Sequence, residues 1–172
     1  MSDFMVKGNR SEDKMKFKYH TDWFLDENKK RVPVRRPRIE IILRKNSEVK
    51  SSSNPEFRTH GLVDSGADIC LVPRQIADVL QIDLNSAQKK ESTGADGKFD
   101  TYQTQIYLEL VYRNMPVGIE MVDVSIPERD PDGIDLDQNI LLGRRDLFKK
   151  YEITFNEVDK TILFKKIQPN NR

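Results

Sequence analysis

Residues 61–73 (GLVDSGADICLVP) bring together side chains that can do acid–base chemistry. Asp64 ends an apolar run and is followed directly by Ser65, Gly66 and Ala67. Gly66 permits a sharp turn, Ser65 offers a hydroxyl for hydrogen bonding, and the small Ala67 keeps the turn narrow. Such a turn would leave open space around the carboxylate, which suits a catalytic acid or base. The alternative is a surface turn in which the aspartate caps the backbone between two strands.

The segments around this stretch are mostly strand-like, and helical spacing occurs twice. After Pro73, the residues Ile76, Val79 and Leu80 fall on one helix face. We expect strands over 38–45, 57–64, 104–112, 116–126 and 139–143, a hairpin of 151–155 with 161–166, and short helices over 74–82 and 144–151. Helices and strands do not alternate, so the sequence predicts an all-β (β-rich) domain with mostly antiparallel ladders.

Three motifs in this order resemble the retropepsin-like aspartic proteases, closest to the cellular single-lobe members related to retroviral proteases. LVDSGADICLVP (62–73) resembles the family's catalytic strand and loop, and NILLGRRDL (139–147) resembles its later apolar-apolar-Gly strand and helix. STGADGKFDTY (92–102) lies where the family has its flap. The family's more frequent motif is DTGA, and Ser65 keeps the hydroxyl of that threonine. The resemblance covers about residues 38–166.

The resemblance implies a retropepsin-like lobe with one or two short helices and a closed, barrel-like sheet. A single DSGA motif supplies one catalytic aspartate where the family uses two, so the expected active form is a homodimer. The implied activity is aspartic endopeptidase: water activated between two Asp64 carboxylates hydrolyses a peptide bond, with no cofactor and no metal. The alternative is a non-catalytic retropepsin-like module for dimerisation or peptide binding.

The resemblance also assigns roles to further residues. The catalytic loop is supported by Ser65, Gly66 and Ala67. Asp68 and Arg144 are expected to form a structural ion pair, and the alternative is that Arg144 is a solvated residue at a helix start. The flap comprises Thr93, Gly94, Ala95, Asp96, Gly97 and Lys98, and the second apolar-Gly strand comprises Leu141, Leu142 and Gly143.

The chain is expected to divide into a flexible, basic N-terminal arm (1–37), the protease domain (38–166) and a C-terminal tail (167–172). Six of the ten residues in 29–38 are basic, which is compatible with phosphate contacts. A solvated, proline-stiffened arm is the favoured interpretation of that run, so nucleic acid is not the expected partner. The expected partners are a peptide or protein substrate and a second copy of the chain.

The composition and the remaining motifs argue against several other classes of protein and of binding site. Basic and acidic residues balance at 29 to 28, and no apolar run is long enough to span a bilayer. The single cysteine, Cys70, fits a reducing compartment, so a cytoplasmic protein is expected. His20 and His60 are the only candidate bases for a Ser65 nucleophile, and with Cys70 they make a poor zinc set. The acidic loop 128–138 lacks the spacing of a calcium-binding helix–loop–helix site.

Overall fold

A computed structural model describes residues 14–47, 54–94, 97–130 and 139–168. The expectation of a β-rich fold with two short helices is confirmed. The strands are β1 (Lys14–Lys18), β2 (His20–Leu25), β3 (Arg31–Arg36), β4 (Arg38–Arg44), β5 (Glu56–Val63), β6 (Cys70–Leu71), β7 (Gln88–Gly94), β8 (Gly97–Tyr112), β9 (Met115–Pro127), β10 (Leu141–Leu142), β11 (Tyr151–Asn156) and β12 (Thr161–Lys166). The helices are α1 (Arg74–Val79) and α2 (Arg144–Lys150).

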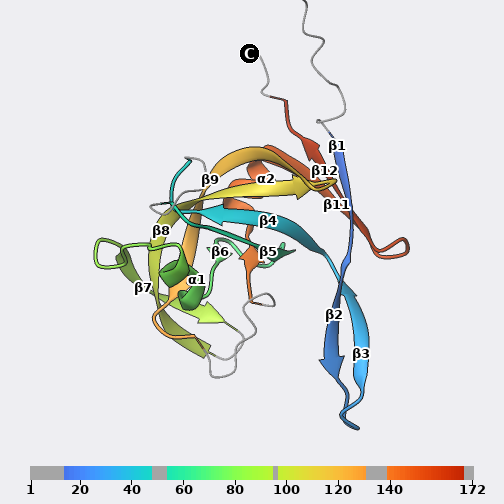
Figure 1. Ribbon diagram of the computed structural model, residues 1–172, viewed down its shortest axis with the longest axis horizontal. Helices are drawn as coiled ribbons and strands as arrows, with labels where there is room; N and C mark the ends of the chain where they lie inside the picture. Colours follow the sequence, from blue (N-terminus) through green and yellow to red (C-terminus); the bar gives the residue numbers. More distant parts are fainter. Residues whose placement is uncertain (1–13, 48–53, 95–96, 131–138, 169–172) are drawn as a thin grey trace, which may run out of the picture.

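Six strands close into a mixed β-barrel, in the order β4-β5-β10-β6-β9-β8 with β8 returning to β4 (Figure 1). The expected closed, barrel-like sheet is therefore present. The β10–β5 and β6–β9 ladders are parallel, and the other ladders in this sheet are antiparallel. Strand β7 pairs only with β8, so together they form a hairpin that extends from the barrel.

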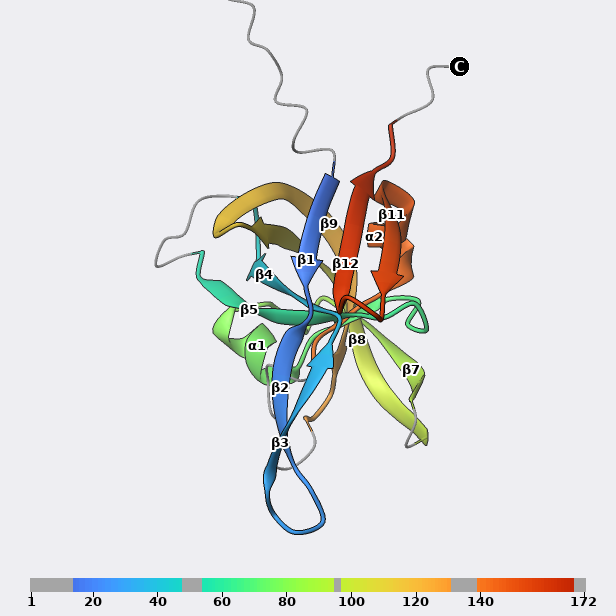
Figure 2. The same cartoon turned by 90° about the vertical axis from the view of Figure 1, so that its right-hand side faces the viewer.

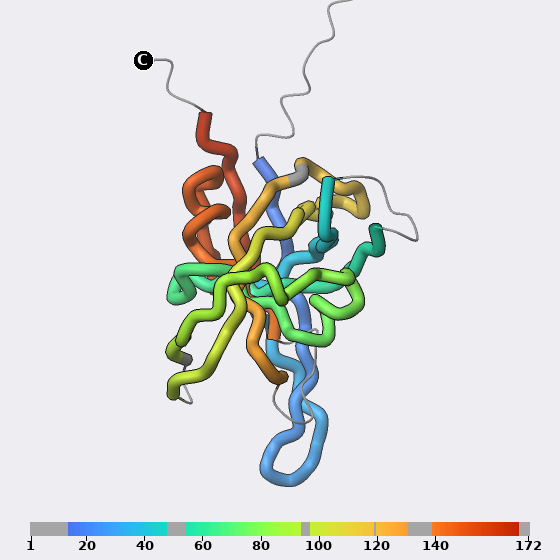
Figure 3. The backbone as a smooth tube through the Cα atoms, turned by 90° about the vertical axis from the view of Figure 1, so that its left-hand side faces the viewer, coloured from blue at the N-terminus to red at the C-terminus, as the bar shows by residue number. Residues whose placement is uncertain are grey.

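The N-terminal region differs from the flexible arm expected over residues 1–37. Within the described part, β1 pairs with β12 along its whole length, while β2 and β3 pair only with each other. This two-stranded β2–β3 ribbon projects beyond the barrel in all three views (Figures 1, 2 and 3). Pro33 is tolerated in β3 because each strand of a two-stranded sheet has one edge that needs no hydrogen bonds. Residues 1–13 and 169–172 of the expected arm and tail lie outside the described residues.

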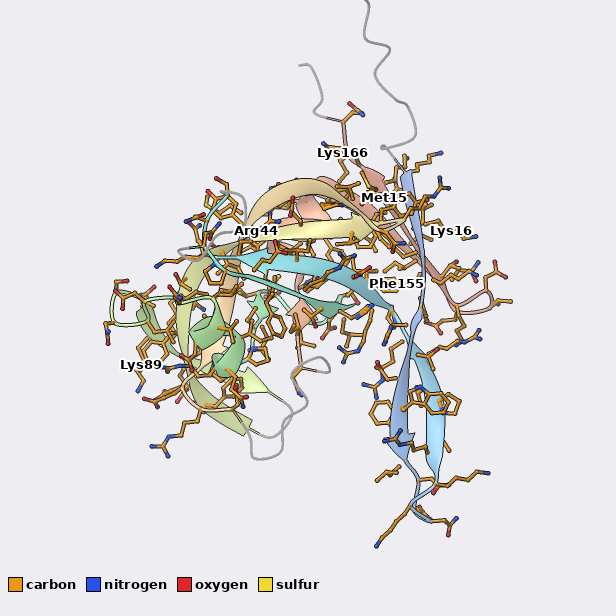
Figure 4. All side chains as sticks on the ribbon, in the orientation of Figure 1. Met15, Lys16, Arg44, Lys89, Phe155 and Lys166 are labelled. Atoms are coloured by element: carbon orange, nitrogen blue, oxygen red, sulfur yellow. The ribbon has the colours of Figure 1, made fainter. Side chains whose placement is uncertain are left out.

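The three-stranded sheet β1–β12–β11 adds a second part to the core. Met15, Phe17 and Tyr19 alternate with lysines and are buried, as period-two strand geometry requires. Figure 4 shows the result for two neighbours on β1, with Met15 and Lys16 on opposite sides of the strand. The ring of Phe17 lies edge-on to Phe164 at 5.4 Å between centroids. The strand is thus fixed to the domain by aromatic packing.

The helices lie where the 3.6-residue spacing predicts them, and both contact β9. Helix α1 buries Ile76 and Ala77, followed by Leu80 at its C-cap. Helix α2 buries Leu147 and begins directly after Gly143. Each helix therefore follows a two-residue barrel strand, β6 for α1 and β10 for α2. The Arg144 N–H donates to the Ala67 carbonyl, so the start of α2 lies beside the segment that carries Asp64.

Candidate functional site

Asp64 is the first residue after β5, at the point where that strand meets β10. Leu142 of β10 pairs in parallel with Val63, and its carbonyl accepts a hydrogen bond from the Asp64 backbone N–H at 3.1 Å. The Asp64 side chain is half-buried, so the carboxylate is held in place and is still accessible. That combination suits a group that must exchange a proton with a bound molecule.

The turn after Asp64 is organised around its own carboxylate. The Gly66 N–H donates to Asp64 Oδ1 at 2.8 Å, and the Ala67 N–H donates to the Asp64 carbonyl at 3.3 Å. A Cβ on Gly66 would lie 3.2 Å from the same Oδ1, so a bare glycine leaves room for this contact. Ser65 and Gly66 are exposed, and Ala67 is half-buried. The described residues form a tight turn after Asp64, and Ser65 and Gly66 are exposed beside the carboxylate.

The turn is tied to the start of α2 by its backbone. The Arg144 N–H donates to the Ala67 carbonyl at 2.9 Å, and the Arg145 N–H donates to the Asp68 carbonyl at 2.8 Å. Gly143 lies so close that a Cβ there would be 2.5 Å from the carbonyl carbon of Ile69. No side chain fits that gap, so glycine is required for the two segments to meet. The predicted DSGA and ILLGR motifs are therefore brought together.

Asp68 and Arg144 form the expected ion pair between the turn and α2. The hydrogen bond and charge of Arg144, with a smaller contribution from Arg145, hold the pKa of Asp68 below its usual range. The side chains are 75% and 54% exposed, respectively. A buried pair would be strongly destabilised by loss of one partner, whereas this exposed pair is screened by solvent and contributes little to the stability of the single chain.

Cys70 lies beneath the same junction. It is buried, and its Sγ accepts a hydrogen bond from the Gly143 N–H at 3.3 Å. Burial raises the pKa of the thiol to about 11, which the hydrogen bond from Gly143 only partly offsets. A thiol this protonated is a poor nucleophile at neutral pH. Its packing against β10 agrees with a small core residue.

The predicted flap is the end of the β7–β8 hairpin. Thr93 pairs with Lys98 and Gly94 with Gly97, whose φ of 111° suits glycine. The predicted flap residues Ala95 and Asp96 lie outside the described residues. The hairpin and the turn after β5 lie on the same side of the barrel (Figures 2 and 3). The hairpin is thus on the correct side to cover that turn.

Sequence reasoning missed a surface groove between β6, β9 and the base of this hairpin. It is lined by Ile69, Gln88, Gln103, Thr104, Gln105, Asp123 and Val124. Within it, Gln105 Nε2 donates to Asp123 Oδ1 at 2.9 Å. No sequence pattern indicated this groove, because the pairing that brings Ile69 beside β8 is long-range and leaves no local signal.

Two further observations concern metal and membrane. Within residues 14–47, 54–94, 97–130 and 139–168, no cluster of three or more His, Cys, Asp or Glu side chains is placed to hold a metal ion. Neither helix in the described part of the chain is long and apolar enough to cross a bilayer.

No protein-family model matches the chain, and no curated protein matches it either. The site is therefore interpreted from its own geometry and from the motifs that it brings together.

Proposed function

We propose that the chain is one lobe of a retropepsin-like aspartic endopeptidase that acts as a homodimer. The observation that carries the proposal is the half-buried Asp64, which ends a barrel strand with its Oδ1 held by the Gly66 N–H. The close approach of Gly143 to Ile69 holds this turn in place. In a two-fold symmetric dimer, each copy would contribute one carboxylate to a shared site. A rigid acid in an open turn suits that arrangement.

In the proposed dimer, the two Asp64 carboxylates face each other across the two-fold axis. Adjacent carboxylates cannot both ionise easily, so the pair holds one proton between them. The ionised carboxylate removes a proton from a water molecule, which attacks the carbonyl carbon of the peptide bond. The protonated carboxyl donates to the carbonyl oxygen as negative charge develops there. Collapse of the tetrahedral intermediate then breaks the C–N bond. The amine leaves with the proton that the carboxylate had taken from water, and the other product is the carboxylic acid.

The neighbouring residues have supporting roles in this proposal. Ser65, exposed beside the carboxylate, is assigned to hydrogen bonding across the two-fold axis. The Gly66 carbonyl is assigned to the substrate backbone, and the β7–β8 hairpin is assigned to cover the substrate and exclude water. The substrate would bind as an extended strand, with main-chain hydrogen bonds and side chains in alternating directions. The groove beside Ile69 is a surface where one of those side chains would lie.

The direct test replaces the carboxylate with a group of the same shape. We expect Asp64→Asn to abolish cleavage of an unfolded protein such as casein while circular dichroism and sedimentation stay unchanged. Asp78→Asn is the matched control, because it removes an exposed carboxylate that pairs with Arg74 on α1. Pepstatin, a mimic of the tetrahedral intermediate, should inhibit the wild-type chain, whereas a chelator should leave it active.

The results of these assays distinguish the proposed endopeptidase from a non-catalytic peptide-binding module. Full activity in a verified Asp64→Asn protein would refute the mechanism. A wild-type chain that binds casein without cleaving it would favour the non-catalytic peptide-binding module. If specific activity does not fall on dilution below the dimer dissociation constant, the shared site is wrong.

A further inference from the structure

One face of the β2–β3 ribbon is exposed although it carries large apolar side chains. The register places Thr21, Trp23 and Leu25 of β2 opposite Arg35, Pro33 and Arg31 of β3, and we call these six residues the Trp23 face. Trp23 is 57% exposed and Leu25 is 66% exposed. Exposed tryptophan flanked by arginine is typical of binding surfaces rather than of free protein surface.

The opposite face of the ribbon anchors it to the barrel. The Nε of Arg38 donates to Asp22 Oδ2 at 2.9 Å, with both side chains buried. The ring of His20 stacks on His60 of β5 with centroids 4.1 Å apart. The guanidinium of Arg36 lies 4.5 Å from the centre of the Phe24 ring. The first two contacts attach the ribbon to barrel strands β4 and β5, whereas Arg36 and Phe24 both belong to the ribbon. The ribbon is thus attached through one face, and the Trp23 face is left for another molecule.

The anchor connects the ribbon to the strand that carries Asp64. The carbonyl of Pro37, directly after β3, accepts a hydrogen bond from the Val63 N–H at 2.9 Å, and Val63 precedes Asp64. The ribbon and the β7–β8 hairpin also project from the barrel in the same general direction (Figures 1 and 2). The base of the ribbon therefore lies next to the end of the strand that leads into Asp64.

Charge indicates what such a polypeptide would carry. Residues 14–38 contain nine Lys and Arg against three Asp and Glu. Residues 39–172 contain eighteen against twenty-two. The basic charge is thus concentrated in the N-terminal strands, while the rest of the chain is acidic. A nucleic acid would be attracted to the ribbon but repelled by the neighbouring barrel, whereas a short acidic segment needs only the ribbon.

The ribbon also offers backbone for binding. Strands β2 and β3 pair only with each other in the described structure, so the outer edge of β2 can accept an added strand, whereas Pro33 removes an N–H donor from β3. Strand addition supplies main-chain hydrogen bonds, and alternating side chains then supply specificity. An added strand directs every second side chain toward the Trp23 face. Acidic and apolar residues two positions apart would therefore match the arginines and the apolar side chains of that face.

We propose that the Trp23 face binds an extended, acidic and apolar segment of the protein substrate, away from the bond that is cleaved. That the bound segment belongs to a substrate rests on the proposed function, but the binding itself does not depend on catalysis. It assigns the ribbon a role in selecting long substrates whose acidic segments lie at a distance from the cleaved bond.

Trp23 is the single tryptophan of the chain, so its fluorescence reports directly on this face. The binding test uses the full Asp64→Asn chain and a synthetic peptide that repeats Glu-Ser-Leu-Ser, which places Glu and Leu on the same face of an extended strand. The control peptide has Lys in place of each Glu. We expect a saturable blue shift with the Glu peptide, weakened by salt, and none with the Lys peptide. No shift with either peptide, or equal shifts with both, would overturn the proposal.

Charge-reversal variants test whether the peptide binds at the Trp23 face. Arg31→Glu with Arg35→Glu should weaken binding of the Glu peptide about tenfold or more, because two exposed ion pairs become repulsive. Lys16→Glu with Lys18→Glu makes the same charge change on exposed positions of β1 and should leave the affinity within about twofold. Equal weakening in both double variants would show non-specific attraction and overturn the proposal.

Other occupants give different signals. A blue shift that depends on protein concentration without peptide would assign the face to a second copy. A larger shift with a single-stranded oligonucleotide than with the Glu peptide would assign it to nucleic acid. Either result overturns the proposal.

A cleavage assay separates this inference from the proposed function. In the wild-type background, Arg31→Glu with Arg35→Glu should raise KM for a peptide with an acidic extension and leave a six-residue peptide unaffected. Equal changes for both peptides would contradict a distant binding role. If no peptide is cleaved but Trp23 still responds selectively to the Glu peptide, the proposed catalytic function fails and the binding surface stands.

Discussion

The turn at Asp64 and the β2–β3 ribbon both depend on β5, yet they are built in opposite ways. The turn is enclosed by backbone: it bonds to Leu142, Arg144 and Arg145, and Gly143 approaches it too closely for any side chain. The ribbon is attached at its base by side chains, chiefly the Asp22–Arg38 pair, and its outer face is open. A site for chemistry needs fixed geometry, whereas a surface for binding needs exposed side chains. The two regions divide these requirements between them.

The largest expected effect tests the enclosed turn. Gly143→Ala should cost about 5 kcal/mol or more, because a Cβ there would meet the Ile69 backbone, which cannot move independently of the barrel. Urea unfolding measures the loss. Gly66→Ala is the control and should cost about 1 kcal/mol or less, since its Cβ would approach only Asp64 Oδ1. Similar costs at both glycines would show that the turn is not tightly enclosed.

The next effect tests the attachment of the ribbon. Asp22→Asn should cost about 3 kcal/mol, because it removes the charge of the carboxylate to which the buried Arg38 donates. Arg36→Met is the control: its Nε lies 3.9 Å from Asp22 and the side chain is half-exposed, so we expect less than about 1 kcal/mol. Urea unfolding of both variants gives the values. If the Asp22→Asn protein is as stable as the wild type, this pair does not anchor the ribbon.

A smaller effect depends on pH and tests burial beneath the turn. Because the folded state raises the pKa of Cys70 from 9.0 to about 11, the folded protein binds this proton more tightly than the unfolded chain. The resulting stability is complete below pH 9 and is lost as the pH rises to 11, by about 2–3 kcal/mol.

Cys70→Ala removes that titration and is compared with wild type by urea unfolding at pH 8 and pH 11. The wild-type protein should lose more stability over this interval than the variant. Tyr19, whose pKa is raised to about 12 mainly by burial and then by its hydrogen bond to Glu157, is present in both proteins and cancels. Parallel losses in the two proteins would place Cys70 in contact with solvent.

The smallest effect is expected at the surface of the turn. Asp68→Asn should leave the melting temperature at pH 7 nearly unchanged, because the pair with Arg144 is exposed. The lowered pKa of Asp68 means that any stabilisation is present at neutral pH and is lost on acidification through that pKa. Thermal scans of both proteins at pH 7 and pH 3 check this. A large fall at pH 7 would show that the ion pair contributes more than its exposure suggests.

The barrel and its helices could be predicted from the sequence because their signals are local. Ile76, Val79 and Leu80 repeat at helical spacing, and α1 covers residues 74–79 of the predicted 74–82. Strand β8 is longer than predicted and begins at Gly97, because its polar first half faces solvent and shows no apolar alternation. The juxtaposition of Asp64 with Gly143 came from the resemblance, since no local pattern specifies a contact between segments so distant in the sequence.

The N-terminal strands were missed for two different reasons. Met15, Phe17 and Tyr19 do alternate with lysines, so the signal for β1 was present but was outweighed by the high charge of the segment. The ribbon was missed because Pro33 argues against a central strand, and a two-stranded ribbon has no central strand. Trp23 could not be separated from the buried aromatic residues, since exposure depends on how far the ribbon extends from the barrel.

The proposed activity depends most directly on one condition, that the Asp64 carboxylates of two copies form a single site. Mixing wild-type and Asp64→Asn chains at a fixed total concentration, with time for subunit exchange, tests it without further structural work. If each site needs both carboxylates, activity falls as the square of the wild-type fraction, and an equal mixture retains about a quarter of the wild-type activity. An equal mixture that retains about half would mean that each chain acts alone, and that result would contradict the shared site.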